Sequence, residues 1–170
     1  MKALILVDFE NEWITKDSEY YVGDLKDVLD NTNKLIAHAR KKGFKIIFIK
    51  HVEKGSEDSF AEGSKRTEII SSLDRKKSDV VMTKYKISAF YKTSLEKELA
   101  GVDSIVVCGV LANLCVRSLV EDAYDREFKV GVVKDCCVAM DEETLEFTFK
   151  DLRATRAEVE FLSLKDFLKR

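Results

Sequence analysis

Three side chains that could do chemistry together follow apolar runs in this 170-residue chain. Asp8 comes directly after the first run, Lys84 shortly after the third, and Cys115 a few residues after the fourth. A carboxylate can remove the proton of a thiol, and a lysine beside both favours their ionised forms. The residue types and positions therefore suggest a catalytic group built on a cysteine nucleophile.

Cys115 is the most informative of the three. The residues from Val106 to Cys115 predict a strand, a tight turn at Gly109 and the start of a helix. The first turn of a helix favours a thiolate, and its free N–H groups can hold an oxyanion. A buried structural cysteine is the alternative interpretation. Cys108 lies at the end of the apolar run, so we assign it to the core.

Asp8 and Lys84 are less specific when each is taken alone. A carboxylate at a strand end can cap a turn, bind a metal or act as a general base. Most lysines are solvated, as we expect for Lys86 two positions further on. Their functional assignment therefore depends on elements that bring them to one place.

Six apolar, β-rich runs predict strands that are covered on both faces, as in a parallel sheet. The runs are Ala3–Val7, Lys45–Ile49, Val80–Met82, Ser104–Val107, Val130–Val133 and Val159–Leu162. Amphipathic segments between or after them predict helices over Asp24–Lys42, Asn113–Glu127, Asp141–Leu152 and Ser163–Leu168. This alternation predicts an α/β fold, a three-layer α/β/α sandwich, with one domain over residues 1–170. Ligands of such sheets bind beyond the carboxyl ends of the strands.

The segment His51–Ser78 is the least regular part of the chain. It predicts one helix near Lys65–Leu73 and a stretch rich in Gly, Ser and Glu. A lid over the site and a plain surface loop both remain open for it.

Charge and cysteine content narrow the class of protein. The chain has 29 basic and 31 acidic residues that are interspersed, so we expect neither nucleic acid nor a membrane surface as partner. The first apolar run is too short for a secretory segment, so we expect a cytoplasmic protein with reduced thiols. Cys136 and Cys137 lack the spacing of a metal or redox motif.

Three segments resemble the motifs of the isochorismatase-like cysteine hydrolase superfamily: Asp8–Trp13 (DFENEW), Lys84–Thr93 (KYKISAFYKT) and Gly109–Tyr124 (GVLANLCVRSLVEDAY). The resemblance runs in order over the whole chain and includes Asp135–Ala139. The superfamily contains nicotinamidases, N-carbamoylsarcosine amidohydrolases, biuret and ureidoacrylate hydrolases, and isochorismatases.

The resemblance carries specific expectations. It implies that Asp8, Lys84 and Cys115 form a catalytic triad on a six-stranded parallel sheet in the order 3-2-1-4-5-6. It implies a cis peptide bond between Val110 and Leu111, which would let the N–H groups of Leu111 and Cys115 form an oxyanion hole. It also implies a homodimer or a higher homo-oligomer.

Two departures from the family pattern affect the expected chemistry. Glu10 stands where the first motif usually has glutamine. The nicotinamidase subgroup holds a metal with an Asp-x-His motif and a further histidine after the second strand, whereas this chain has His51 alone. His38, the only other histidine, lies within a predicted helix. We therefore expect no metal and no other cofactor, and nicotinamide is a less favoured substrate.

These observations favour a metal-independent hydrolase of a small amide, ureide or related C–N bond that works through a thioester acyl-enzyme. The retained Cys115 disfavours true isochorismatase chemistry. An activated thiol at this position is expected to react with iodoacetamide well below about pH 8. Candidates to line the pocket for a small-molecule substrate are Phe9, Trp13, Phe60, Phe90 and Tyr91. A vinyl-ether or other non-amide hydrolase on the same scaffold is one alternative, and a catalytically silent binding protein is another.

Overall fold

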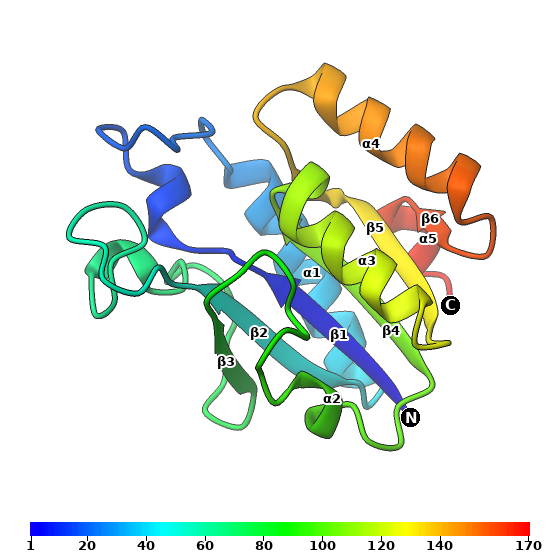
Figure 1. The fold of residues 1–170 in the computed structure, drawn as a ribbon. Helices are drawn as coiled ribbons and strands as arrows, with labels where there is room; N and C mark the ends of the chain where they lie inside the picture. Colours follow the sequence, from blue (N-terminus) through cyan, green and yellow to red (C-terminus); the bar gives the residue numbers. More distant parts are fainter.

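A six-stranded, all-parallel sheet in the order β3-β2-β1-β4-β5-β6 organises the computed structural model, which describes residues 1–170 (Figure 1). The strands are β1 (Lys2–Val7), β2 (Lys45–His51), β3 (Val80–Lys84), β4 (Ser104–Val110), β5 (Lys129–Val138) and β6 (Glu160–Leu162). The predicted fold and strand order are confirmed. Several strands extend past their apolar runs, because backbone pairing such as that of His51 with Lys84 continues into polar residues.

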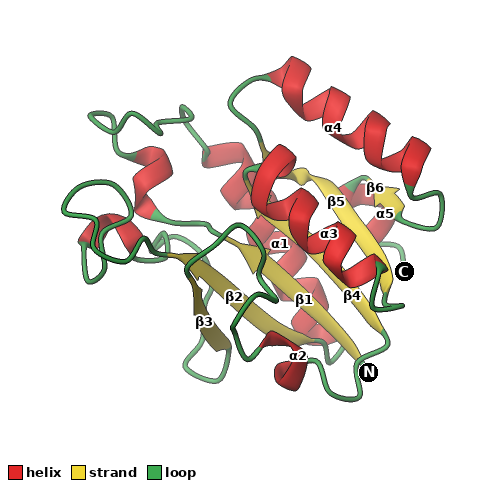
Figure 2. Ribbon diagram, in the orientation of Figure 1, coloured by secondary structure: helices red, strands yellow, loops and turns green.

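Helices cover both faces of the sheet. The helices are α1 (Lys26–Lys41), α2 (Leu95–Glu98), α3 (Arg117–Tyr124), α4 (Glu142–Thr155) and α5 (Leu164–Phe167). Helices α1 and α5 lie on one face, and α3 and α4 lie on the other (Figure 2). Shorter turns are the 3-10 turns η1 (Asn11–Ile14) and η2 (Lys65–Thr67) and the π-helical turn η3 (Ala112–Val116). No helix has the length and apolar composition needed to cross a membrane.

The predicted helix over Lys65–Leu73 is wrong beyond the single turn η2. The backbone that follows η2 pairs instead with the chain after β1, where Ile70 N–H donates to the Phe9 carbonyl and Asn11 N–H donates to the Glu68 carbonyl. These contacts join residues that are far apart in sequence, so local helix propensity does not decide the conformation.

Strands β1 and β4 approach each other closely at their carboxyl ends. Residues Ala3–Val7 of β1 are fully buried in the middle of the sheet. Gly109 in β4 has a φ of +147°, and a Cβ built on it would lie 2.2 Å from the Val7 carbonyl oxygen. Only glycine therefore allows β4 to run this close to β1.

Candidate active site

Lys84 connects the three residues that the sequence singles out. Its Nζ lies 2.8 Å from Asp8 Oδ2 and 3.2 Å from Cys115 Sγ. The side chains of Asp8 and Lys84 are completely buried, and Cys115 is partly exposed. The three groups are therefore close enough for proton transfer among them.

Strand order explains why a lysine fits this place. β2 lies between β1 and β3, so Asp8 and Lys84 start from strands that are about 10 Å apart. Lys84 is the last residue of β3, and its long side chain spans the end of β2. Asp8 turns the chain out of the sheet with a left-handed φ of 51°, a conformation that aspartate tolerates better than most residues.

The sequence predicts Cys115 in the first turn of an α-helix. In the structure it lies in the π-helical turn η3, and α3 begins only at Arg117. The peptide bond between Val110 and Leu111 is cis. The Leu111 carbonyl accepts hydrogen bonds from Leu114 N–H and Val116 N–H, at 3.2 and 3.1 Å. The N–H of Leu111 itself has no acceptor within the protein, so it is free for a ligand.

The thiol of Cys115 is not a preformed thiolate. Burial and the negative charge of Asp8 raise its pKa to about 12, although Lys84 acts in the opposite direction. Burial therefore acts against the predicted reactivity of this thiol below about pH 8, and that reactivity stays a prediction. For Lys84, burial lowers the pKa, but Asp8 and Cys115 outweigh it and the net pKa is raised. The resting group is a thiol beside a buried ion pair.

Glu10 is a second buried carboxyl group next to the site. Its side chain is fully buried, and neither oxygen has a hydrogen-bond partner. Burial, and then the charge of Asp8, raise its pKa to about 10. Glu10 is therefore protonated at neutral pH, and it resembles in charge and shape the glutamine that the family usually has there.

His51 reaches the same lysine from the end of β2. Its Nδ1 lies 3.3 Å from Lys84 Nζ, and its Nε2 lies 3.6 Å from Glu53 Oε1. No three histidine, cysteine or carboxylate side chains come together as a metal site. A single histidine that faces an ammonium group does not fit a zinc site of the kind described for the nicotinamidase subgroup.

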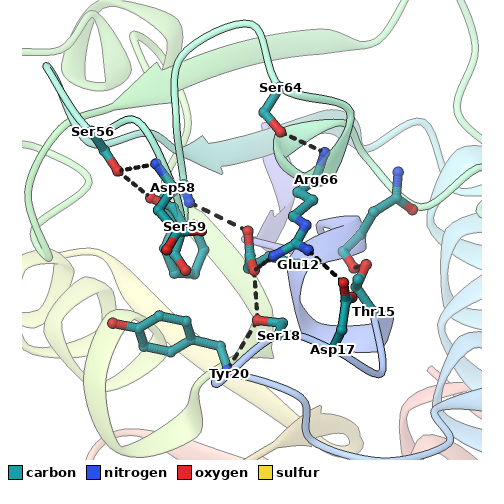
Figure 3. A network of polar contacts seen from close by, with 12 residues as sticks. Glu12, Thr15, Asp17, Ser18, Tyr20, Ser56, Asp58, Ser59, Ser64 and Arg66 are labelled. Carbon is teal, nitrogen blue, oxygen red and sulfur yellow. Dashed lines mark hydrogen bonds and ion pairs between the residues drawn. The ribbon is translucent and has the colours of Figure 1, made fainter.

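Glu12 is a buried carboxylate that the sequence analysis did not single out, and it binds the segment after β2. Glu12 is fully buried and accepts hydrogen bonds from Ser18 Oγ at 2.5 Å and from Phe60 N–H at 3.3 Å (Figure 3). Arg66 forms an ion pair with it at 3.4 Å and with Asp17 at 3.0 Å. The segment that carries Phe60 and Arg66 is thereby tied to the chain around η1.

An aromatic residue of this segment packs with aromatic residues of the chain around η1 and forms one wall beside His51. The Phe60 ring lies 5.3 Å from the Trp13 ring and 5.2 Å from the His51 ring, and Tyr20 joins them at 5.1 Å from Phe60. Tyr20 was not among the predicted pocket residues. Phe9 is buried in the core.

Phe90 and Tyr91 lie in the chain that follows Lys84. Arg126 lies 4.3 Å from the Phe90 ring, and Phe128 stacks on it at 6.4 Å, at the far end of α3. Tyr91 is half-exposed beside Lys92. The chain after Lys84 packs against α3, where Ser88 Oγ donates to Asp122 Oδ2 at 2.6 Å, and the assignment of Phe90 and Tyr91 to the substrate pocket stays a prediction.

Burial dominates the surroundings of the other cysteines. Cys108, Cys136 and Cys137 are all buried, and no disulfide forms among the four cysteines. Burial raises the pKa of Cys136 and of Cys137 to about 12, and raises that of Cys108 well above its ordinary value. None of the three approaches Lys84 as Cys115 does.

The raised pKa of Glu10 predicts a pH-dependent stability. Between its unfolded value of 4.5 and its folded value of about 10, only the folded chain keeps the proton, so the free energy of unfolding falls as pH rises. Glu10→Gln removes this pH dependence. The free energy of unfolding of the variant should therefore increase relative to that of the wild type by on the order of 1 kcal/mol per pH unit. Urea denaturation at several pH values measures it. Glu96→Gln, at an exposed position, is the control, and parallel curves for Glu10→Gln and wild type would contradict the assignment.

The chain matches the isochorismatase domain model over residues 2–161. It is 30% identical over 156 residues to an uncharacterized isochorismatase family protein of Bacillus subtilis, with 86% of this chain and 85% of the relative covered. It is 26% identical to the ureidoacrylate amidohydrolase of Acinetobacter baylyi, covering 79% and 69%. Nicotinamidase 3 of Arabidopsis thaliana is also 26% identical, covering 88% and 79%.

Solved structures agree with this assignment. An isochorismatase family protein from Desulfovibrio vulgaris superposes with a TM-score of 0.89 at 25% identity, covering 99% of this chain and 98% of that chain. The pyrazinamidase of Pyrococcus horikoshii in complex with zinc shares the fold, with a TM-score of 0.84 at 21% identity over 95% and 98% of the two chains. The chain therefore belongs to the isochorismatase family and is a hydrolase of that family.

Proposed function

We propose that the protein hydrolyses a small amide, ureide or related C–N bond, with Cys115 as nucleophile and a thioester as intermediate. The observation that carries the proposal is the position of Lys84, whose ammonium lies within hydrogen-bond distance of both Asp8 and Cys115. Relatives named ureidoacrylate amidohydrolase and nicotinamidase support a C–N bond as the target.

The first half of the reaction begins with a neutral thiol. Because the pKa of Cys115 is about 12, the proton moves to Asp8 as the sulfur attacks the substrate carbonyl carbon. The carbonyl π electrons move to its oxygen, and the N–H groups of Leu111 and Cys115 stabilise that oxyanion. When the carbonyl re-forms, the C–N bond breaks, and Asp8 returns the proton to the departing nitrogen. Ammonia or an amine leaves, and the acyl group stays on sulfur.

The second half releases the acyl group. Asp8 takes a proton from water, the resulting hydroxide attacks the thioester, and the C–S bond breaks. The sulfur then recovers a proton from Asp8, which restores the thiol. Lys84 keeps its proton throughout, because its raised pKa makes it a fixed positive charge beside two groups that become negative in turn.

The pocket has features that suit a small substrate. Cys115 is the only member of the catalytic group that is partly exposed, so the substrate approaches from the sulfur side. Trp13 and Phe60 supply an apolar, aromatic wall close to His51. Such a wall favours a flat amide or ureide group over a large polar ligand.

Replacement of the nucleophile is the central test. Cys115→Ala should lower turnover by about three orders of magnitude or more, because the remaining oxyanion donors and binding contacts supply only part of the acceleration. Ammonia release from a panel of amides, carbamoyl compounds and ureides measures the rate. Cys108→Ala, Cys136→Ala and Cys137→Ala are matched controls at buried cysteines and should keep turnover, with any loss confined to stability.

Two outcomes of that test would change the mechanism. If Cys115→Ala kept more than about a tenth of the wild-type rate, direct attack of water guided by Asp8 would replace the covalent route. If no panel compound released ammonia but a vinyl ether was cleaved, the non-amide hydrolase would be the better assignment. Mass spectrometry of the wild type during turnover detects the acyl group on Cys115.

Chelators should leave activity unchanged. The ammonium of Lys84 lies 3.3 Å from His51 Nδ1 and repels a cation from the one histidine near the site. Turnover before and after EDTA treatment is the measurement. A loss that zinc or manganese restores would show that metal participates.

We also propose a homodimer or a higher homo-oligomer, in agreement with the family resemblance. Two apolar side chains around α4 support it, because Met140 is 49% exposed and Phe147 is 63% exposed. Light scattering should give a mass above the 19.4 kDa of one chain, and Phe147→Asp should lower it. Ile87→Asp, at an exposed apolar residue outside α4, is the control, and a wild-type monomer would contradict the proposal.

A further inference from the structure

The ammonium of Lys84 has three close neighbours, and only two of them belong to the proposed reaction. An ammonium carries three N–H donors and no acceptor. The donors have Asp8 Oδ2 at 2.8 Å, Cys115 Sγ at 3.2 Å and His51 Nδ1 at 3.3 Å. The side chain of Lys84 is completely buried, so these three groups form the polar surroundings of its ammonium.

The contact between Lys84 Nζ and His51 Nδ1 indicates which ring nitrogen of His51 carries the proton. A lysine ammonium can only donate, so Nδ1 must be the acceptor and the ring proton must be on Nε2. Nε2 faces the carboxylate of Glu53 at 3.6 Å, and that carboxylate is mostly exposed. The imidazole is therefore neutral and connects the buried lysine with the surface.

The surroundings of His51 hold the ring in this state. The Phe60 ring packs edge-on against it at 5.2 Å, and the Phe60 N–H is fixed by buried Glu12 (Figure 3). Burial, and then the charge of Lys84, lower the pKa of His51 below its ordinary value of 6.5, whereas Asp8 and Glu53 act in the opposite direction.

Other titratable groups near His51 do not reverse this balance. Glu10 lies close to the His51 backbone but is protonated at neutral pH, and Cys115 is a neutral thiol on the far side of Lys84. The charges that face the ring are therefore the ammonium of Lys84 and the carboxylates of Asp8 and Glu53.

We propose that His51 is a positioning residue: as a neutral imidazole it accepts a hydrogen bond from Lys84 and holds the ammonium between Asp8 and Cys115. Protonation of His51 removes the acceptor and places two cations 3.3 Å apart, which releases Lys84 from that position. This role deepens the proposed function, because Lys84 stabilises the negative charge that forms on Cys115 and Asp8.

Asparagine and leucine at position 51 separate the hydrogen bond from the bulk of the side chain. The two residues have the same branched shape, but only the asparagine oxygen can accept from Lys84. Iodoacetamide labelling of Cys115 at about pH 8, followed by mass spectrometry, reports the stabilisation of the thiolate without any substrate. His51→Asn should label at a rate within about twofold of wild type, and His51→Leu about tenfold more slowly. Cys115→Ala gives the background from the buried cysteines.

Nitrogen-15 NMR of the histidine rings tests the contact directly. The neutral His51 ring should show the Nε2–H tautomer and titrate below 6.5 in the wild type. In Lys84→Met the titration of His51 should move to higher pH, because a nearby positive charge has gone. His38 lies on α1 against Phe167, away from Lys84, which makes its ring signals an internal control. Comparison with His51→Asn assigns the two rings.

Three results would overturn the inference. They are an Nδ1–H tautomer for His51, a His51 titration that Lys84→Met leaves unchanged, or equal labelling of His51→Asn and His51→Leu. Circular dichroism of each variant separates these results from a failure to fold. None of the measurements needs turnover, so a Cys115→Ala variant that still hydrolyses substrate would refute the covalent mechanism and leave the His51 contact intact.

Discussion

The site depends on a single buried positive charge. An isolated ammonium in a protein interior costs several kcal/mol unless opposite charge and acceptors surround it. Lys84 is completely buried, and its partners come from the end of β1, the end of β2 and the turn η3. These three segments must therefore keep their relative positions for the lysine to remain charged. The ion pair of Lys84 and Asp8 thus couples the positions of the strand ends to one another.

Burial also sets the protonation of the site. The exclusion of water that strengthens the pair of Lys84 and Asp8 raises the pKa of Cys115 to about 12 and that of Glu10 to about 10. The raised pKa keeps the Cys115 thiol mostly protonated, so in the proposed mechanism its proton moves as the sulfur attacks. Glu10 remains neutral, which avoids a second negative charge beside Asp8.

Two features outside the catalytic group make this arrangement possible. Gly109 lets β4 approach β1 more closely than any other residue would allow. Glu12 binds the segment after β2 through Phe60 N–H and Arg66, and the Phe60 ring packs edge-on against His51. Gly109 thus affects the position of the turn that carries Cys115, and Glu12 affects how well His51 is shielded from water.

The sequence by itself determined the six strands, their alternation with helices and the identity of Asp8, Lys84 and Cys115. These features are local, because a buried parallel strand needs a continuous apolar run and each reactive residue follows within a few residues of such a run. Only the tertiary structure decided the contact of His51 with Lys84, the network around Glu12, the raised pKa of Cys115 and the stacking of Phe90 on Phe128. Each of these depends on burial or on pairing between distant segments, as does the loss of the helix expected near Ile70. Residue type and spacing show which groups are present, but desolvation and long-range contacts set their charge and their partners.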